Sequence, residues 1–140
     1  MTRIEHIGVW VLDIDAVAAF YARHFGARIG QRYENPCKGF ASRFLDFGGG
    51  ARLELMTRAD VTERAPKEQL GLAHVAIALD GEAAVDALAA ELRMAGVPIE
   101  DGPRRTGDGY YECVARDPEG NRVEITADRN AADAGIEKSR

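Results

Sequence analysis

The chain has 140 residues, of which 46% are hydrophobic, and a formal net charge of −5 at pH 7. This length and composition suit one domain with a substantial core, and the lack of a basic stripe excludes nucleic acid as an expected partner. No apolar run approaches the ~20 residues that cross a bilayer, so we expect no membrane partner either.

The start of the chain and its thiols indicate the compartment. Met1 to Arg3 lead directly into a strand-like run, so we expect no signal peptide. Cys37 and Cys113 are the only two cysteines, too few for a disulfide framework and not spaced as a zinc pair. The sequence therefore predicts a cytoplasmic protein with reduced thiols, in which Cys113 is a small buried hydrophobe and Cys37 a loop residue.

The first half of the chain predicts a strand, a helix and then three strands. Asp13 offers an N-cap for the helix and Gly26 ends it. Proline and glycine make residues 35–39 a loop, three glycines make 48–50 a turn, and the charged residues 57–70 form a connector. The expected elements are strands at 4–11, 27–33, 40–47 and 51–56 and a helix at 14–25.

The second half repeats this order. Gly96 ends its helix, residues 102–109 form a glycine-rich loop, and the Asp117-Pro118-Glu119-Gly120 run is a strong turn signal. Residues 128–140 lack apolar periodicity and are expected to form a flexible tail. The expected elements are strands at 72–79, 97–100, 110–116 and 122–126 and a helix at 82–95.

Each half carries a histidine on its first strand and a glutamate on its last. Strand alternation places His6, Glu54, His74 and Glu124 on the side opposite the apolar, helix-facing side chains. A glutamate amid apolar strand residues is costly to bury unless it is paired or binds a cation. Glu5, next to His6, points to the other face by the same alternation and is left out of the set.

Two imidazoles and two carboxylates would neutralise one divalent ion. This mixed nitrogen and oxygen set suits zinc, nickel, cobalt or manganese and leaves coordination positions for water or substrate. A lone strand histidine is more often a core or surface residue, and a lone strand glutamate more often faces solvent. The repetition of both in each half favours the metal. His24, on the expected helix, has no matching partner and is interpreted as structural.

These residues carry a resemblance to a known family. The four positions, together with the closing segment from Asp117 to Glu124, resemble the vicinal oxygen chelate superfamily, and the likeness runs from about Arg3 to about Ala127. That superfamily includes glyoxalase I, methylmalonyl-CoA epimerase, fosfomycin thiol transferases, extradiol dioxygenases and bleomycin-resistance proteins. The resemblance implies an α+β fold. One domain over residues 1–127 would contain two βαβββ modules, at about 3–57 and 71–127, whose curled mixed sheets form a cup around one metal ion.

Within that superfamily the ligand count points to glyoxalase I. Dioxygenases and fosfomycin-type transferases lack a ligand at the position of Glu54, whereas bacterial glyoxalase I has all four. The implied reaction is methylglyoxal detoxification, in which a lyase isomerises the hemithioacetal of a 2-oxoaldehyde and a thiol such as glutathione. The product is a 2-hydroxyacyl thioester, formed through a metal-stabilised ene-diolate. By resemblance Glu124 is the favoured catalytic base and Glu54 its counterpart.

The substrate side of the site departs from glyoxalase I. Trp10 stands where that enzyme has an arginine that contacts a glutathione carboxylate. The glycine-rich loop over residues 104–111 is interpreted either as a substrate lid or as an ordinary connection, and Tyr110 is a candidate cleft residue along with Trp10. The arginines that we consider as sources of the missing charge are Arg43, Arg104, Arg105 and Arg122.

Two other kinds of function stay open at this point. One is another enzyme of the superfamily, an epimerase or a dioxygenase. The other is a non-catalytic protein of the bleomycin-resistance kind, which binds a flat ligand without a metal. A homodimer is expected, and the cup forms either within one chain or across that dimer.

Overall fold

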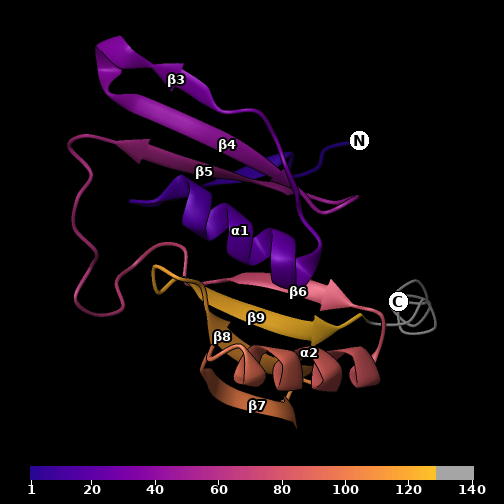
Figure 1. The fold of residues 1–140 in the computed structure, drawn as a ribbon. Coiled ribbons are helices and arrows are strands. Elements are labelled where there is room, and N and C mark those ends of the chain that lie inside the picture. The colour runs from indigo at the N-terminus through magenta and orange to yellow at the C-terminus, as the bar shows by residue number, and fades with distance from the viewer. Residues whose placement is uncertain (129–140) are drawn as a thin grey trace. The chain divides into compact units, whose positions relative to one another are not determined.

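The computed structural model describes residues 1–128 and divides them into two compact units. Unit 1 comprises Met1–Gln69 with Asp117–Glu119, and unit 2 comprises Leu70–Arg116 and continues from Gly120. Each unit contains one open mixed sheet and one long helix, which confirms the predicted α+β class (Figure 1). Apart from Asp128, the expected tail at 128–140 lies outside the described residues.

Unit 1 has a mixed sheet in the order β1-β5-β4-β2, with β3 paired to β4. β1 runs parallel to β5, and the other strand pairs are antiparallel. Its elements are β1 (His6–Trp10), α1 (Ile14–Phe25), β2 (Arg28–Ile29), β3 (Tyr33–Asn35), the 3-10 helix η1 (Pro36–Lys38), β4 (Phe40–Asp46) and β5 (Arg52–Arg58).

Helix α1 forms where the sequence predicts it and covers one face of this sheet. The Asp13 side chain accepts a hydrogen bond from the Ala16 N–H at 3.0 Å, and Gly26 ends the helix in the left-handed conformation at φ 68°. Val17 and Tyr21 on α1 are buried, as are Leu53 and Leu55 on β5. The helix-facing side of the sheet therefore forms the core, and Glu54, between Leu53 and Leu55, lies on the opposite side.

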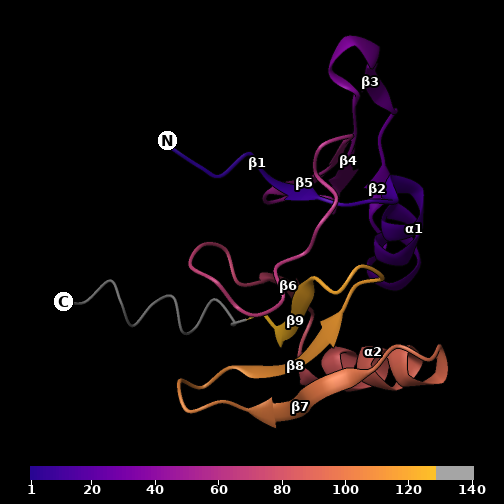
Figure 2. The same cartoon turned by 90° about the vertical axis from the view of Figure 1, so that its left-hand side faces the viewer.

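Unit 2 has the order β6-β9-β8-β7, with β6 parallel to β9. Its elements are β6 (Val75–Leu79), α2 (Glu82–Met94), β7 (Ile99–Arg105), β8 (Tyr111–Arg116) and β9 (Arg122–Ala127). Figures 1 and 2 show α2 lying along one side of this sheet. Val85 and Leu92 of α2 are fully buried, as are Val123 and Ile125 of β9, so this core repeats the arrangement of unit 1.

Three of the predicted strands are wrong in extent. The strand expected at 72–79 begins only at Val75, as β6. The strand expected at 27–33 is interrupted after β2. The Gly30 N–H still donates to the Phe44 carbonyl of β4 at 2.8 Å, but the Gly30 carbonyl accepts from Arg43 Nη1 at 2.8 Å, and the next strand, β3, begins at Tyr33. The strand expected at 97–100 extends to Arg105 as β7, which takes in part of the expected loop. Its pairing with β8 continues past Gly102 through two register shifts, and a local glycine and proline count does not reveal such bulges.

The Asp117–Glu119 turn makes specific contacts with the start of α1. The Glu119 carboxylate accepts hydrogen bonds from the Leu12 and Asp13 N–H groups at 2.6 and 2.7 Å. The Tyr21 hydroxyl donates to Asp117 Oδ2 at 3.1 Å, and burial, with the nearby Asp117 charge, raises the Tyr21 pKa well above its usual value. The sequence identified the turn but not its partners.

No helix in the described part of the chain has the length and apolar character needed to cross a bilayer.

Candidate functional site

His6 and Glu54 come together on the face of the unit 1 sheet opposite α1. Gly8 of β1 pairs with Glu54 of β5, which sets His6 diagonally across from the glutamate. His6 Nε2 lies 3.6 Å from Glu54 Oε1. The Met56 side chain lies over Gly8 on this face, since a Cβ atom added at Gly8 would come within 2.8 Å of Met56 Cε. The strand alternation inferred from the sequence therefore holds for both residues.

His74 and Glu124 form the matching pair in unit 2. Ala76 of β6 pairs with Glu124 of β9, and His74 precedes Ala76 by the same interval that separates His6 from Gly8. His74 Nε2 lies 3.2 Å from Glu124 Oε2, although His74 itself stands just before β6 rather than inside a strand. The two units thus present a histidine and a glutamate in the same register.

Each pair is chemically suited to one side of a divalent ion. Two donors about 2.1 Å from an ion, at angles of 90 to 109°, lie about 3.0 to 3.4 Å apart, and the His74–Glu124 separation falls in that range. The His6–Glu54 separation is slightly longer. Among the described residues no three His, Cys, Asp or Glu side chains gather as a metal site. The structure brings the four predicted ligands together as two pairs, and their common ion stays a prediction.

Glu5 takes part in the first pair, which the sequence did not predict. Its carboxylate hydrogen-bonds His6 Nδ1 and also forms an ion pair with Arg52. These two partners lower the Glu5 pKa, His6 contributing most. Alternation failed here because Glu5 precedes β1 and its side chain bends back to the neighbouring ring. A carboxylate on Nδ1 fixes the imidazole orientation and leaves Nε2 as the ligand nitrogen. Ala73 occupies the corresponding place before His74.

Glu112 is a second residue that sequence reasoning missed. It lies on β8, pairs with Thr126 of β9, and alternates with the buried Cys113, so it shares the Glu124 face. Desolvation by partial burial, and then the adjacent Glu124 charge, raise the pKa of Glu112. The alternation around Cys113 was a usable signal for it. Unit 2 therefore places a second carboxyl group beside the His74–Glu124 pair.

The predicted substrate residues of unit 1 lie on different faces. Trp10 is on the His6 face, where its ring meets Phe40 edge to face at 6.3 Å and the Arg58 guanidinium lies 4.9 Å from it. Arg43 lies on the helix side instead, since it hydrogen-bonds Asp15 of α1 at 3.1 Å. Trp10 is thus placed to contact a ligand near Glu54, whereas Arg43 is held on the other face by its hydrogen bond to Asp15 of α1.

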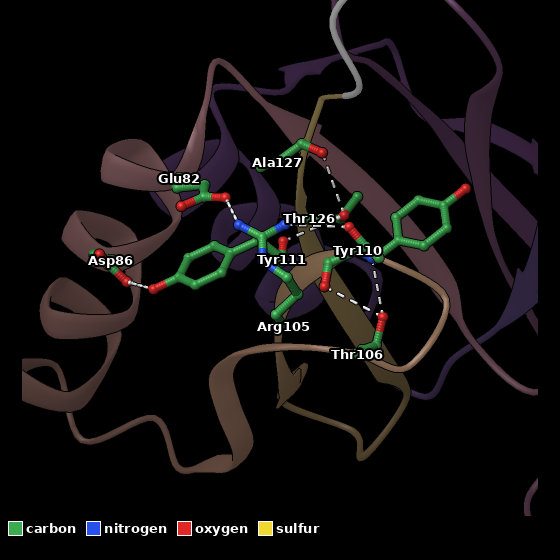
Figure 3. A network of polar contacts seen from close by, with 9 residues as sticks. Glu82, Asp86, Arg105, Thr106, Tyr110, Tyr111, Thr126 and Ala127 are labelled. Carbon is green, nitrogen blue, oxygen red and sulfur yellow. Dashed lines mark hydrogen bonds and ion pairs between the residues drawn. The ribbon is translucent and has the colours of Figure 1, made fainter. Parts of the chain in front are cut away.

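The side chains of the loop at 104–111 also point to two different sides of the sheet of unit 2. Figure 3 shows the Arg105 guanidinium against Glu82 of α2 and the Tyr111 ring directed at Asp86, while the Tyr110 ring points the other way. The Thr106 N–H donates to the Tyr110 carbonyl at 2.7 Å, closing a tight turn. Arg105 is therefore on the helix side, and Tyr110 remains the candidate on the other side.

Arg104, His24 and the two cysteines have surroundings of the usual structural kind. Arg104 is paired with Asp101 at 2.8 Å. The ring of His24 meets that of Phe20 at 5.1 Å, in keeping with a structural role. Cys113 is buried, which raises its pKa to about 11, and Cys37 is exposed in η1.

The family follows from the sequence profile described as the Glyoxalase/Bleomycin resistance protein/Dioxygenase superfamily, which matches residues 3–125. That range includes both His–Glu pairs and nearly the whole described chain. The chain belongs to this superfamily. Proteins of the glyoxalase superfamily commonly use a divalent metal and bind small-molecule substrates. No curated protein sequence matches the chain significantly.

Solved structures of glyoxalase superfamily proteins share the fold at low sequence identity. The trypanothione-dependent glyoxalase I of Leishmania major is 23% identical with a TM-score of 0.78, over 99% of this chain and 95% of that chain. The lactoylglutathione lyase of Agrobacterium tumefaciens is 27% identical with a TM-score of 0.66, over 91% and 94% respectively. Glyoxalase I of Zea mays is 26% identical with a TM-score of 0.72, over 91% of this chain but 45% of that one.

Proposed function

We propose that this chain is a metal-dependent lyase of the glyoxalase I type. It would convert the hemithioacetal of a 2-oxoaldehyde and a thiol into a 2-hydroxyacyl thioester. The observation that carries the proposal is the repeated His–Glu pair, in the same strand register and on the same face in both units. Similarity to solved glyoxalase I structures supports the fold but leaves the reaction to be tested.

In this proposal His6, Glu54, His74 and Glu124 hold one zinc, nickel, cobalt or manganese ion, with all four supplied by one chain or by two chains of a homodimer. A bound divalent ion supplies Lewis acidity, which stabilises negative charge on the two adjacent substrate oxygens. Glu5 orients the His6 ring for metal binding through Nε2 by its hydrogen bond with Nδ1.

The proton transfer falls to a carboxylate on the same face. Glu124 is the favoured base, and Glu54 is its counterpart in the first unit. Either would take the proton from one substrate carbon and return it to the neighbouring carbon. The carboxyl of Glu112 beside Glu124 is placed to influence this transfer, because its charge changes the proton affinity of its neighbour.

The surface around Trp10 bears on which thiol serves as cosubstrate. Trp10, with Phe40 and Arg58 around it, offers an aromatic surface rather than a lone arginine near the first pair. Arg43 and Arg105 are engaged on the helix sides of their sheets. We therefore propose that the thiol differs from glutathione in the group that contacts this surface. The cytoplasmic location stays the proposal made from the sequence.

The test combines metal content with turnover. Purified chain, loaded in turn with each of the four metals, is mixed with methylglyoxal and glutathione, cysteine or 2-mercaptoethanol, and thioester formation is followed by ultraviolet absorbance. We expect more thioester with cysteine or 2-mercaptoethanol than with glutathione for at least one metal, and its loss in Glu124→Gln. His74→Ala should lose metal by elemental analysis, whereas His24→Ala, the matched control on α1, should keep it.

Two results would count against the lyase. Full metal content without thioester formation in any combination would remove the reaction but keep the metal site. Unchanged metal content in both His74→Ala and Glu124→Gln would remove the site itself.

A second candidate is supported by the contact between Trp10 and Phe40. A protein of the bleomycin-resistance kind binds a flat ligand, and the Trp10 ring, which is 38% exposed beside the half-buried Phe40 ring, suits that use. Such a protein would lack stoichiometric metal, and the fluorescence of Trp10, the only tryptophan, would be quenched by planar ligands without turnover.

A further inference from the structure

Unit 1 contains a cavity of about 320 Å³ that none of the predicted site residues lines. It is formed by the segment before β1, the first residues of β2 and β5, the end of β4 and the glycine turn between β4 and β5. Its charged residues are Arg3, Glu5, Arg28, Asp46 and Arg52. All of these lie in one compact unit, so the cavity is complete within it.

The charges around the cavity do not balance. Arg28 pairs with Asp46 at 3.3 Å, and Arg52 pairs with Glu5. Arg3 has no ion pair with any residue in the described part of the chain. The lining therefore carries three cations against two carboxylates, an excess of positive charge in a chain whose net charge is −5. That excess favours an anion at this place.

The hydrogen-bond donors are also incompletely used. A guanidinium has five N–H donors, and the hydrogen bonds that Arg28 and Arg52 make with side chains of residues 1–128 use Nη2 alone. The Gly48 N–H is taken by Asp46 Oδ1 at 2.7 Å, which together with Arg28 lowers the Asp46 pKa. The remaining guanidinium donors match the oxygens of a carboxylate or a phosphate, which arginine binds in a fork geometry.

The glycine turn leaves one wall of the cavity without side chains. A Cβ atom added at Gly48, Gly49 or Gly50 would meet no other atom within 4 Å, so the space beside the turn is open. Gly48 and Gly50 have φ values of 87° and 68°, which side-chain-bearing residues rarely adopt. The sequence therefore keeps this wall bare, and a ligand can approach the backbone.

We propose that this cavity binds the anionic group of a small ligand, a carboxylate or a phosphate, on Arg3, Arg28 and Arg52. The site is independent of the metal and of the proposed reaction. It is nevertheless connected to the first histidine, because Arg52 binds Glu5 and Glu5 binds His6 Nδ1. An anion held there lies one ion pair and one hydrogen bond away from the candidate metal ligand.

The test titrates the full-length, chelator-treated chain with inorganic phosphate and, separately, with succinate, while amide chemical shifts are followed by NMR. We expect saturable shifts of the Gly48, Gly49 and Gly50 amides with at least one of the two anions. The tighter one identifies the chemistry. Arg3→Gln should weaken binding about fivefold, the loss expected for one partly exposed charge contact, and Arg28→Gln should do the same.

Arg32→Gln is the matched control. Arg32 is another arginine of unit 1 that pairs with a glutamate, Glu34, but it does not line the cavity. Its variant should bind as the unaltered chain does. Absence of saturable shifts at the turn with both anions would overturn the proposal. So would equal affinity in Arg3→Gln, Arg28→Gln and Arg32→Gln, because binding would then reflect surface charge alone.

Discussion

Removal of the Glu5 carboxylate should weaken metal binding although Glu5 is not a predicted ligand. Its hydrogen bond to His6 Nδ1 restrains the imidazole, and loss of such an outer partner lowers metal affinity by about 10 to 100-fold. The Glu5 side chain is 48% exposed and is shared with Arg52, so its restraint is partial. We therefore expect Glu5→Ala to lower affinity by about tenfold, the lower end of that range.

Affinity is measured by competition with a chromophoric chelator, with cobalt as the ion because its absorption also reports coordination. Glu5→Gln keeps an acceptor for the Nδ1 hydrogen and should fall between the unaltered chain and Glu5→Ala. Glu34→Ala, which removes another exposed glutamate paired with an arginine, should leave affinity unchanged. Equal cobalt affinity in Glu5→Ala and Glu34→Ala would refute the claim that Glu5 orients His6.

Three further predictions concern stability. Tyr21→Phe deprives the buried Asp117 of a hydrogen bond and should lower the free energy of unfolding by about 1 to 2 kcal/mol in urea, with no change expected if water replaces the hydroxyl. Leu55→Ala, at a position 1% exposed, should cost about 2 to 5 kcal/mol in the same measurement, and a cost below that range would contradict close packing against α1. The pKa values of Glu5 and Asp46 are lowered in the native chain, so both carboxylates stabilise the fold at pH values above their usual pKa values of 4.5 and 3.8. This stabilisation is lost as the pH falls through the lowered native pKa values. Glu5→Gln should therefore lose less thermal stability on acidification than the unaltered chain.

Local periodicity was sufficient for the element order and for the face of each sheet that bears the candidate ligands. Helix spacing with Asp13 and Gly26 defined α1 closely, because capping and the apolar stripe are encoded within a few residues. Alternation placed Glu54 and Glu124 opposite their helices, because side chains on a strand must point to alternate sides. The duplication in the sequence then linked each glutamate to its histidine.

Such patterns did not predict where strands end or which distant side chains pair with the arginines. β7 extends through Gly102 because a neighbouring strand supplies its pairing, and local composition does not contain that information. Arg43 and Arg105 were candidates for binding an anionic substrate group because arginine is positively charged. In the structure each is paired with an acidic residue of a helix that is distant in the sequence, Asp15 for Arg43 and Glu82 for Arg105.

The sequence by itself determined the two repeated modules, the helix-facing cores and the face on which each His–Glu pair lies, because all three follow from short-range spacing of apolar and polar residues. Only the tertiary structure decided that Glu5 binds His6, that Glu112 lies beside Glu124, and that Arg3, Arg28 and Arg52 surround one cavity. These are contacts of side chains whose directions depend on strand ends, register and turns. Spacing along the chain does not specify where such side chains meet.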